Sequence, residues 1–227
     1  MGELFTAEFW DYFGPLLLTG TRDTLVMTVV STVFAYLLGL PLGVLLVLTG
    51  DHGICPHQTL NRCVGWVINV GRSLPFIILM VCVMPFTKIL VGTKIGVLGA
   101  IPPLVISAAP FIARMVETSL SEVDAGVVEA TQSMGASTFQ IVWKVYLPEA
   151  LPSLILGGSI SIITILAYTA IAGAIGAGGL GDLAIRYGYQ RREPAKMWVA
   201  AVLLIVLVQV IQSVFSRVSN RIDKRLK

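Results

Sequence analysis

Charged residues are scarce in this sequence, which argues against an ordinary soluble fold. Lys, Arg, Asp and Glu together make up 13% of the chain, whereas about a quarter is usual. Three long stretches contain no charged residue at all: Leu25–Gly50, Ala150–Gly181 and Met197–Ser216. A helix that crosses a hydrocarbon core about 30 Å thick needs about 20 consecutive apolar residues. We therefore predict a polytopic membrane protein.

Groups that catalyse reactions are also few. The sequence has no G-x-x-x-x-G-K-[ST] phosphate loop, so we expect neither an ATPase site nor a cofactor in this chain. The apolar stretches lack the Asp, Glu or His relay of a proton-coupled transporter, and the Ser/His or His/Glu set of an intramembrane hydrolase. The net charge of +3 follows the expected membrane topology, and no nucleic-acid partner is expected.

Cysteine and histidine gather in one short segment without forming a known metal-binding motif. The segment has neither the C-x2-C nor the H-x3-H pairing that is typical of zinc sites. Gly53 and Pro56 favour a polar turn between two spans, which we expect in place of a metal site. The residues concerned are His52, Cys55, His57 and Cys63.

The apolar segments predict five spanning helices. With the turns between them, they leave no room for a separate soluble domain of ordinary size. Residues 1–227 are therefore expected to form a single all-α transmembrane domain. The expected spans are about 24–50, 66–86, 97–114, 151–172 and 197–216, and a loop of two short helices is expected at about 117–149.

Lys and Arg beside the spans predict the orientation, because they collect on the cytoplasmic side. Five cations follow the last span, so the C-terminus is expected in the cytoplasm: Arg217, Arg221, Lys224, Arg225 and Lys227. Five spans then place the N-terminus outside, where acidic residues outnumber Arg22: Glu3, Glu8, Asp11 and Asp23. One external loop argues against this layout, because it carries four cations: Arg186, Arg191, Arg192 and Lys196.

A polar, helix-forming segment interrupts the apolar runs between the third and fourth spans. Its apolar residues fall at helical spacing and predict an amphipathic helix over Glu122–Met134. Gly135 is expected to be a left-handed cap, and Ser137 with Gln140 matches a capping box that starts a second helix. We expect Pro148 to end that second helix. The apolar stripe consists of Val123, Val127, Ala130 and Met134.

The spans themselves contain unusual residues. Arg72 and Pro75 place a cation and a helix breaker in the second span, where we expect Arg72 to be a structural anchor near the cytoplasmic edge. Prolines are expected to interrupt the third span at Pro102, Pro103 and Pro110. Small and hydroxylated residues concentrate in the fourth span, which is therefore expected to line the pathway or its gate. These residues are Ser159, Ser161, Thr164, Tyr168, Thr169 and Ile171.

The polar segment resembles the "EAA" loop by which permease subunits of ABC importers hold their ATPase subunits. The match is E-A-x4-G-x9-V-x-L-P, with Thr131 in place of the second Ala. Other segments are similar to the permeases of bacterial methionine ABC importers, and the similarity extends from about Thr21 to the end. They are Thr24-Leu25 with Met27-Thr28, Arg72–Leu79, Pro85–Thr87, Val91–Thr93, Ala109–Arg114, Gly176–Gly181 and Arg186–Tyr189.

This resemblance implies a permease of the bacterial inner membrane. Two copies of the chain would pair around a central pathway for methionine, with two ABC ATPase subunits that bind ATP and Mg²⁺ and an extracytoplasmic methionine-binding protein. Pro110 and Arg114 would be structural, like Arg72 and Pro75. The residues expected to couple the chain to the ATPase are Glu122, Val127, Glu129, Ala130, Met134, Gly135, Ala136, Leu147 and Pro148.

Two alternatives stay open. Within ABC importers, the transported solute could be another small molecule such as a phosphonate or a quaternary amine. Outside them, an ion-coupled secondary transporter would need internal repeats and broken helices around an ion site, and the sequence displays neither a repeat nor an acidic site.

Overall fold

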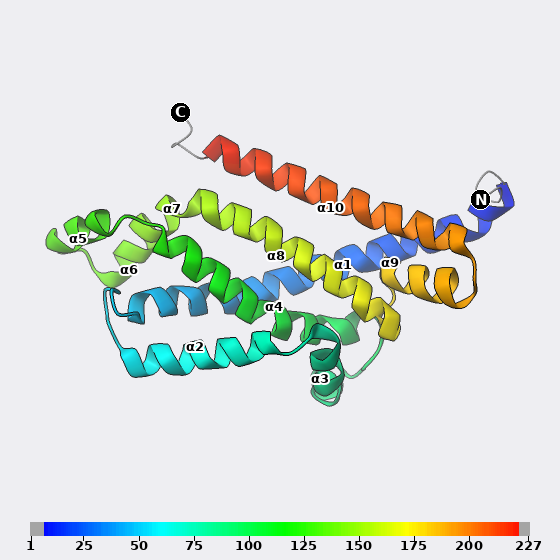
Figure 1. Ribbon diagram of the computed structural model, residues 1–227, viewed down its shortest axis with the longest axis horizontal. Helices are drawn as coiled ribbons and strands as arrows, with labels where there is room; N and C mark the ends of the chain where they lie inside the picture. The colour runs from blue at the N-terminus through cyan, green and yellow to red at the C-terminus, as the bar shows by residue number, and fades with distance from the viewer. Residues whose placement is uncertain (1–6, 223–227) are drawn as a thin grey trace. The chain divides into compact units, whose positions relative to one another are not determined.

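The protein is almost entirely helical (Figure 1). The computed structural model describes residues 7–222, among which no β-strand occurs, and the all-α class is confirmed. The cations Lys224, Arg225 and Lys227 and the acidic Glu3, used above to predict orientation, lie outside the described residues. The α-helices are α1 (Ala7–Thr49), α2 (Gln58–Ser73), α3 (Phe76–Val91), α4 (Gly96–Ser121), α5 (Ala125–Ser133), α6 (Thr138–Ile141), α7 (Leu147–Glu149), α8 (Leu151–Ala172), α9 (Gly179–Asp182) and α10 (Pro194–Ile222). The π-helical segments are Val142–Tyr146, Gly173–Ala177 and Leu183–Gln190.

Among residues 7–222, four helices are each long and apolar enough to cross a membrane. They are α1, α4, α8 with its π-helical extension, and α10, while α2 and α3 pass the same test only as a bent pair. Counting that pair as one span gives the expected five. The expected second span at 66–86 is interrupted at the predicted helix breaker, because Leu74 and Pro75 are not helical. Proline disfavours helical backbone in the residue before it and has no N–H to donate.

The other spans differ from their expected bounds mainly in length. Helix α1 begins at Ala7, well before residue 24, and α10 runs from Pro194 to Ile222. Helix α8 covers the same residues as the expected fourth span. The prediction that prolines interrupt the third span is wrong, because α4 runs unbroken from Gly96 through all three of them to Ser121. Much of α4 is buried inside the protein, where packing offsets the lost backbone hydrogen bonds.

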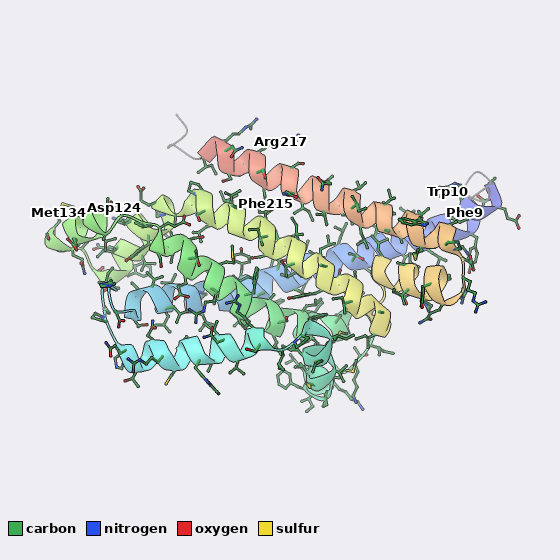
Figure 2. The ribbon with its side chains drawn as sticks, viewed as in Figure 1. Phe9, Trp10, Asp124, Met134, Phe215 and Arg217 are labelled. Atoms are coloured by element: carbon green, nitrogen blue, oxygen red, sulfur yellow. The ribbon has the colours of Figure 1, made fainter. Side chains whose placement is uncertain are left out.

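The chain divides into two compact units, each built from three segments. The first unit contains residues 7–33, Leu74–Ser107 and Ile162–Ile211, and the second contains Phe34–Ser73, Ala108–Ser161 and 212–222. In the first unit, Phe9, Phe13 and Leu17 of α1 pack against Leu180 and Leu183. Figure 2 labels Phe9 and Trp10 at the start of α1, where their rings meet edge to face.

A buried hydrogen bond ties two distant segments of the first unit together. The Leu180 N–H donates to Thr24 Oγ1 across 2.9 Å, which satisfies a donor at the start of α9. Another core lies nearby in the same unit and includes Met27, Phe76 and Ala177. Burial of these side chains supplies the packing energy that a short, glycine-rich segment such as α9 lacks by itself.

The four cations after the fourth span lie in the first unit, and most of them have partners. Arg186 pairs with Asp182 at 2.6 Å, and the buried Lys196 pairs with Glu193. Lys196 also lies 4.7 Å from the centre of the Tyr12 ring, and Arg191 lies 4.5 Å from that of Tyr187. Two of the four positive charges are thus neutralised by carboxylates of the same loop, which reduces their weight as an argument about orientation.

Candidate functional site

The expected docking helix lies in the second unit and begins with an aspartate cap. The side chain of Asp124 accepts hydrogen bonds from the backbone N–H groups of Gly126 and Val127, at 2.7 and 3.3 Å. This cap starts α5 at Ala125, so the prediction that the helix begins at Glu122 is wrong. Glu122 lies in the preceding turn and is exposed. An aspartate in this position stabilises a helix by about 1 kcal/mol.

Helix α5 turns only one side chain into the protein. Val128 is buried, whereas Val127 is 45% exposed and Met134, just after the helix, is 79% exposed. Glu129 and Ala130 are exposed as well. Figure 2 shows Met134 and Asp124 at opposite ends of α5. Three members of the predicted apolar stripe therefore lie on a surface that the second unit leaves uncovered, and only Val123 is partly buried.

The turn after α5 has the predicted left-handed glycine. Gly135 has φ of +79°, and nothing lies within 4 Å of the position that its Cβ would occupy. Its N–H donates to the Gln132 carbonyl at 2.8 Å, and the N–H of the partly buried Ala136 donates to the Thr131 carbonyl at 3.3 Å. These bonds satisfy the last carbonyls of α5 and fix the sharp turn into α6. The tip of this helical hairpin is therefore rigid and open to a partner.

The capping box of the second helix is confirmed. The Ser137 N–H donates to Gln140 Oε1 at 2.9 Å, and the Gln140 N–H donates to Ser137 Oγ at 3.4 Å. The expectation that Pro148 ends this helix is wrong, because the chain stays helical to Glu149. A π-helical segment over Val142–Tyr146 precedes the proline, and the Leu147 N–H donates to the Val142 carbonyl. Leu147 is half-buried and Pro148 is exposed.

The residues expected to be structural have different surroundings. Arg114 joins α4 to α2, because its guanidinium donates to Asn69 Oδ1 at 3.0 Å and pairs with Glu117 at 2.7 Å. Pro110 of α4 packs close to α2, so that a Cβ on Gly71 would lie 2.9 Å from its ring. Arg72 is exposed in the last turn of α2. Since an α-helix rises about 1.5 Å per residue, Arg72 lies about 21 Å along α2 from its first residue, Gln58.

The expected pathway residues divide between the two units, and several are buried within this chain. Ser159 lies in the second unit with Ser161, whose hydroxyl donates to the Gly157 carbonyl at 2.8 Å. In the first unit, Thr169 is buried and its hydroxyl donates to the Leu166 carbonyl at 2.6 Å. The hydroxyls of Ser161 and Thr169 are therefore satisfied by their own helix. Because these two hydroxyls already have acceptors, hydrogen bonding gives no reason to place Ser161 or Thr169 beside a pathway.

The remaining pathway candidates are less enclosed. The Tyr168 ring stacks on Phe76, with 4.5 Å between ring centres and 5° between planes. Ile171 is exposed, and Thr164 and Tyr168 are half-buried. Among the glycines that follow the fourth span, Gly181 packs inside the first unit, since a Cβ there would lie 2.3 Å from the Ala170 carbonyl oxygen. Close approach within one chain thus accounts for this glycine.

The family model of the "Binding-protein-dependent transport system inner membrane component" matches residues 39–227. The chain belongs to this family. Among its relatives, the "Probable D-methionine transport system permease protein MetI" of Vibrio cholerae is 48% identical over 96% of this chain and 97% of its own length. The methionine import system permease protein MetP of Bacillus subtilis is 46% identical over 80% of this chain and 82% of its own length.

Solved structures of this family agree with the fold. A chain of the MetNI methionine ABC transporter, in an inward-facing conformation, superimposes with a TM-score of 0.92 at 46% identity. The match covers 93% of the present chain and 98% of the other. A chain of an amino acid ABC transporter crystallised with histidines shares the fold alone, with a TM-score of 0.74 at 20% identity. The chain is therefore a membrane-spanning permease of the ABC importer type.

Sequence reasoning about this permease missed an aromatic pair beside the expected docking surface. Phe139 and Trp143 are 75% and 64% exposed and stack with 6.3 Å between ring centres and 6° between planes. Two aromatic residues four positions apart on a helix lie on one face, and this spacing was the available signal. Exposed apolar groups of this size mark surfaces that contact lipid or another protein.

Proposed function

We propose that this chain carries methionine, in its D- and L-forms, into the cytoplasm as the permease subunit of an ATP-driven importer. The observation that carries the proposal is the uncovered surface of α5, on which the side chains of Val127, Ala130 and Met134 are exposed. A rigid hairpin with an apolar face fits a groove on another protein. The names and identities of the relatives support methionine as the transported solute.

The proposed assembly contains two copies of the chain, two ATPase subunits and an extracytoplasmic methionine-binding protein. ATP and Mg²⁺ would bind to the ATPase subunits, because the sequence has no phosphate loop. We infer that the chain itself is not catalytic and transmits the movement of the ATPase pair through α5 into the spans. Arg114 of α4, held by its pair with Glu117, donates to Asn69 of α2 and so keeps the two helices together during that movement.

We propose an inner-membrane location with the C-terminus in the cytoplasm and the N-terminus outside. The cations Arg217 and Arg221 near the end of α10 support this orientation. The cations that follow the fourth span are weak evidence against this orientation, because Arg186 and Lys196 are paired with nearby carboxylates. This orientation also puts α5 on the side of the membrane that contains ATP.

Transport by the reconstituted assembly tests the proposed function. The chain, its ATPase and its binding protein would be placed in proteoliposomes, and uptake of labelled methionine would be measured with ATP and with a non-hydrolysable analogue. We expect uptake only with ATP, no loss after an ionophore dissipates ion gradients, and no competition from an alkylphosphonate or a quaternary amine. Uptake driven by an ion gradient alone, or preferential uptake of either competitor, would overturn the proposal.

We predict that the permease dimer by itself has no tight methionine site. A zwitterion removed from water needs paired partners for its carboxylate and its ammonium group, and the long uncharged stretches of the spans offer none. Selectivity would then reside in the binding protein. Isothermal titration of the isolated dimer with methionine should show no binding in the micromolar range. Micromolar binding that methionine analogues displace would contradict the prediction.

We predict that part of α8 lines the pathway between two copies. In a cysteine-free background, a cysteine at Ile171 should react with a water-soluble thiol reagent faster than one at Ser161 or Thr169, because only Ile171 is exposed in the monomer. Reaction should also be slower across Leu203–Val208 of α10, which we expect to face lipid. Protection at Ile171 together with labelling in α10 would reverse the assignment.

A further inference from the structure

A cavity of about 690 Å³ lies behind α5, entirely within the second unit. Its walls come from the end of α1 and the turn that follows, from Asn61 of α2, from the end of α4, and from Tyr146. Helix α5 contributes Ala125, Val128, Glu129 and Gln132, of which only Val128 is buried. Its volume falls within the range of about 300–1,000 Å³ that is usual for small-molecule sites.

The electrostatics of the cavity favour a cation. Glu117 and Glu129 line it; Arg114 offsets the charge of Glu117 from outside the cavity, whereas Glu129 has no ion pair among residues 7–222. Helices α1 and α4 both end at the cavity, and a helix C-terminus carries partial negative charge. The partial positive charge at the N-terminus of α5 is offset, because the Asp124 carboxylate accepts a hydrogen bond from the Gly126 N–H. Among the described residues, no Lys or Arg lines the cavity, and His52 is the single lining side chain able to carry a positive charge.

The hydrogen-bonding groups that remain free in the cavity are mostly acceptors. Asn61 donates both hydrogen bonds of its Nδ2, to the Leu46 carbonyl at 2.8 Å and to Thr49 Oγ1 at 3.1 Å, which leaves its oxygen available. The Ser121 hydroxyl donates to the Glu117 carbonyl at 2.8 Å and keeps its lone pairs. These oxygens match the N–H groups of an ammonium ion.

Tyr146 adds an unsatisfied polar group to this site. Tyr146 is only 7% exposed and lines the cavity. Its hydroxyl has no hydrogen-bond partner among residues 7–222. Burial raises the pKa of the Tyr146 phenol, so the hydroxyl keeps its proton at neutral pH. This hydroxyl can donate one hydrogen bond into the cavity and accept another from a bound ligand. The ring face can also attract a cation.

We propose that this cavity binds a small organic cation, an aliphatic diamine or polyamine from the cytoplasm, between Glu117 and Glu129. A metal ion is a poorer match, because no group of three His, Cys, Asp or Glu side chains suited to a metal occurs among the described residues. A zwitterionic amino acid is disfavoured, because its carboxylate would lie beside the carboxylates of Glu117 and Glu129 and the acceptor oxygens of Asn61 and Ser121. A cation held here bridges the ends of α1 and α4 to α5, and so fixes the position of the helix that carries the uncovered surface.

Calorimetric titration of the purified full-length chain in a zwitterionic detergent tests the proposal. Putrescine is the probe, and 1,4-butanediol, which has the same length and no charge, is the matched control ligand. We expect putrescine to bind at one site per chain and the diol to bind at least about tenfold more weakly, because charge-assisted hydrogen bonds are roughly twice as strong as neutral ones. Equal binding of both ligands, or no binding of putrescine, would overturn the proposal. The measurement needs neither ATPase nor transported solute, so its failure leaves the proposed function untouched.

Two variants locate the bound cation. Glu129→Gln should weaken putrescine binding by about tenfold, and Tyr146→Phe by about threefold, since each removes one contact with the ammonium groups. Glu122→Gln is the matched control, because Glu122 is an exposed acid of the same segment that does not line this cavity. The thermal midpoint without ligand reports folding of each variant. Equal weakening by Glu122→Gln and Glu129→Gln would show attraction to surface charge and overturn the site.

Discussion

Gly135→Pro is expected to abolish assembly of the permease with its ATPase while leaving membrane insertion intact. Proline fixes φ near −65°, whereas this residue has φ of +79° and donates its N–H to the Gln132 carbonyl. The substitution must reopen the turn between α5 and α6 and move the uncovered surface away from its partner. Co-purification of the ATPase should fall by more than about tenfold, which corresponds to about 1.4 kcal/mol of binding free energy.

Gly135→Asn is the matched control for this prediction. Asparagine tolerates left-handed backbone better than other residues with a side chain, and the space beside Gly135 is open. The asparagine variant should therefore retain most ATPase binding, and Glu129→Lys should lose much of it by reversing a charge on α5. Normal complex yield and normal methionine uptake in both Gly135→Pro and Glu129→Lys would exclude α5 as the docking helix.

Gly181→Val is expected to prevent stable folding of the first unit. A Cβ at this position would lie 2.3 Å from the Ala170 carbonyl oxygen and 2.5 Å from its Cα, and neither backbone atom can move without distorting α8. Overpacking usually costs about 1–3 kcal/mol, and we expect about 3 kcal/mol or more against rigid backbone. The thermal midpoint of the purified chain and its yield in the membrane fraction would both fall.

Gly14→Ala provides the contrast, because nothing lies within 4 Å of the position of its Cβ and the residue is in the interior of α1. Alanine is favoured over glycine in a helix by about 0.5–1 kcal/mol, so this variant should be at least as stable as the natural chain. If Gly181→Val unfolds at the same temperature as Gly14→Ala, the close contact between residues 170 and 181 is not needed for folding.

Local features that depend on a few neighbouring residues were predictable. The capping box of Ser137 and Gln140, the left-handed Gly135 and the bounds of α8 all follow from short-range rules about backbone hydrogen bonds and apolar length. The start of α5 was misplaced because apolar spacing does not reveal which polar side chain caps a helix. Asp124 is the capping residue, because its carboxylate accepts hydrogen bonds from two free backbone amides. The prediction that Pro148 ends the second helix failed for a related reason, because the π-helical segment before it accommodates the proline.

The sequence by itself determined the membrane class, the helical content and the position of the polar hairpin, because each depends on the composition and spacing of neighbouring residues. Tertiary structure alone decided which side of α5 is buried, since Val128 packs inward while Val127 and Met134 remain exposed. It also decided that Ser161 and Thr169 are enclosed by their own chain, and that Glu117, Glu129 and Tyr146 meet at one cavity. Such contacts join residues far apart in the chain, and no local pattern encodes which of them come together.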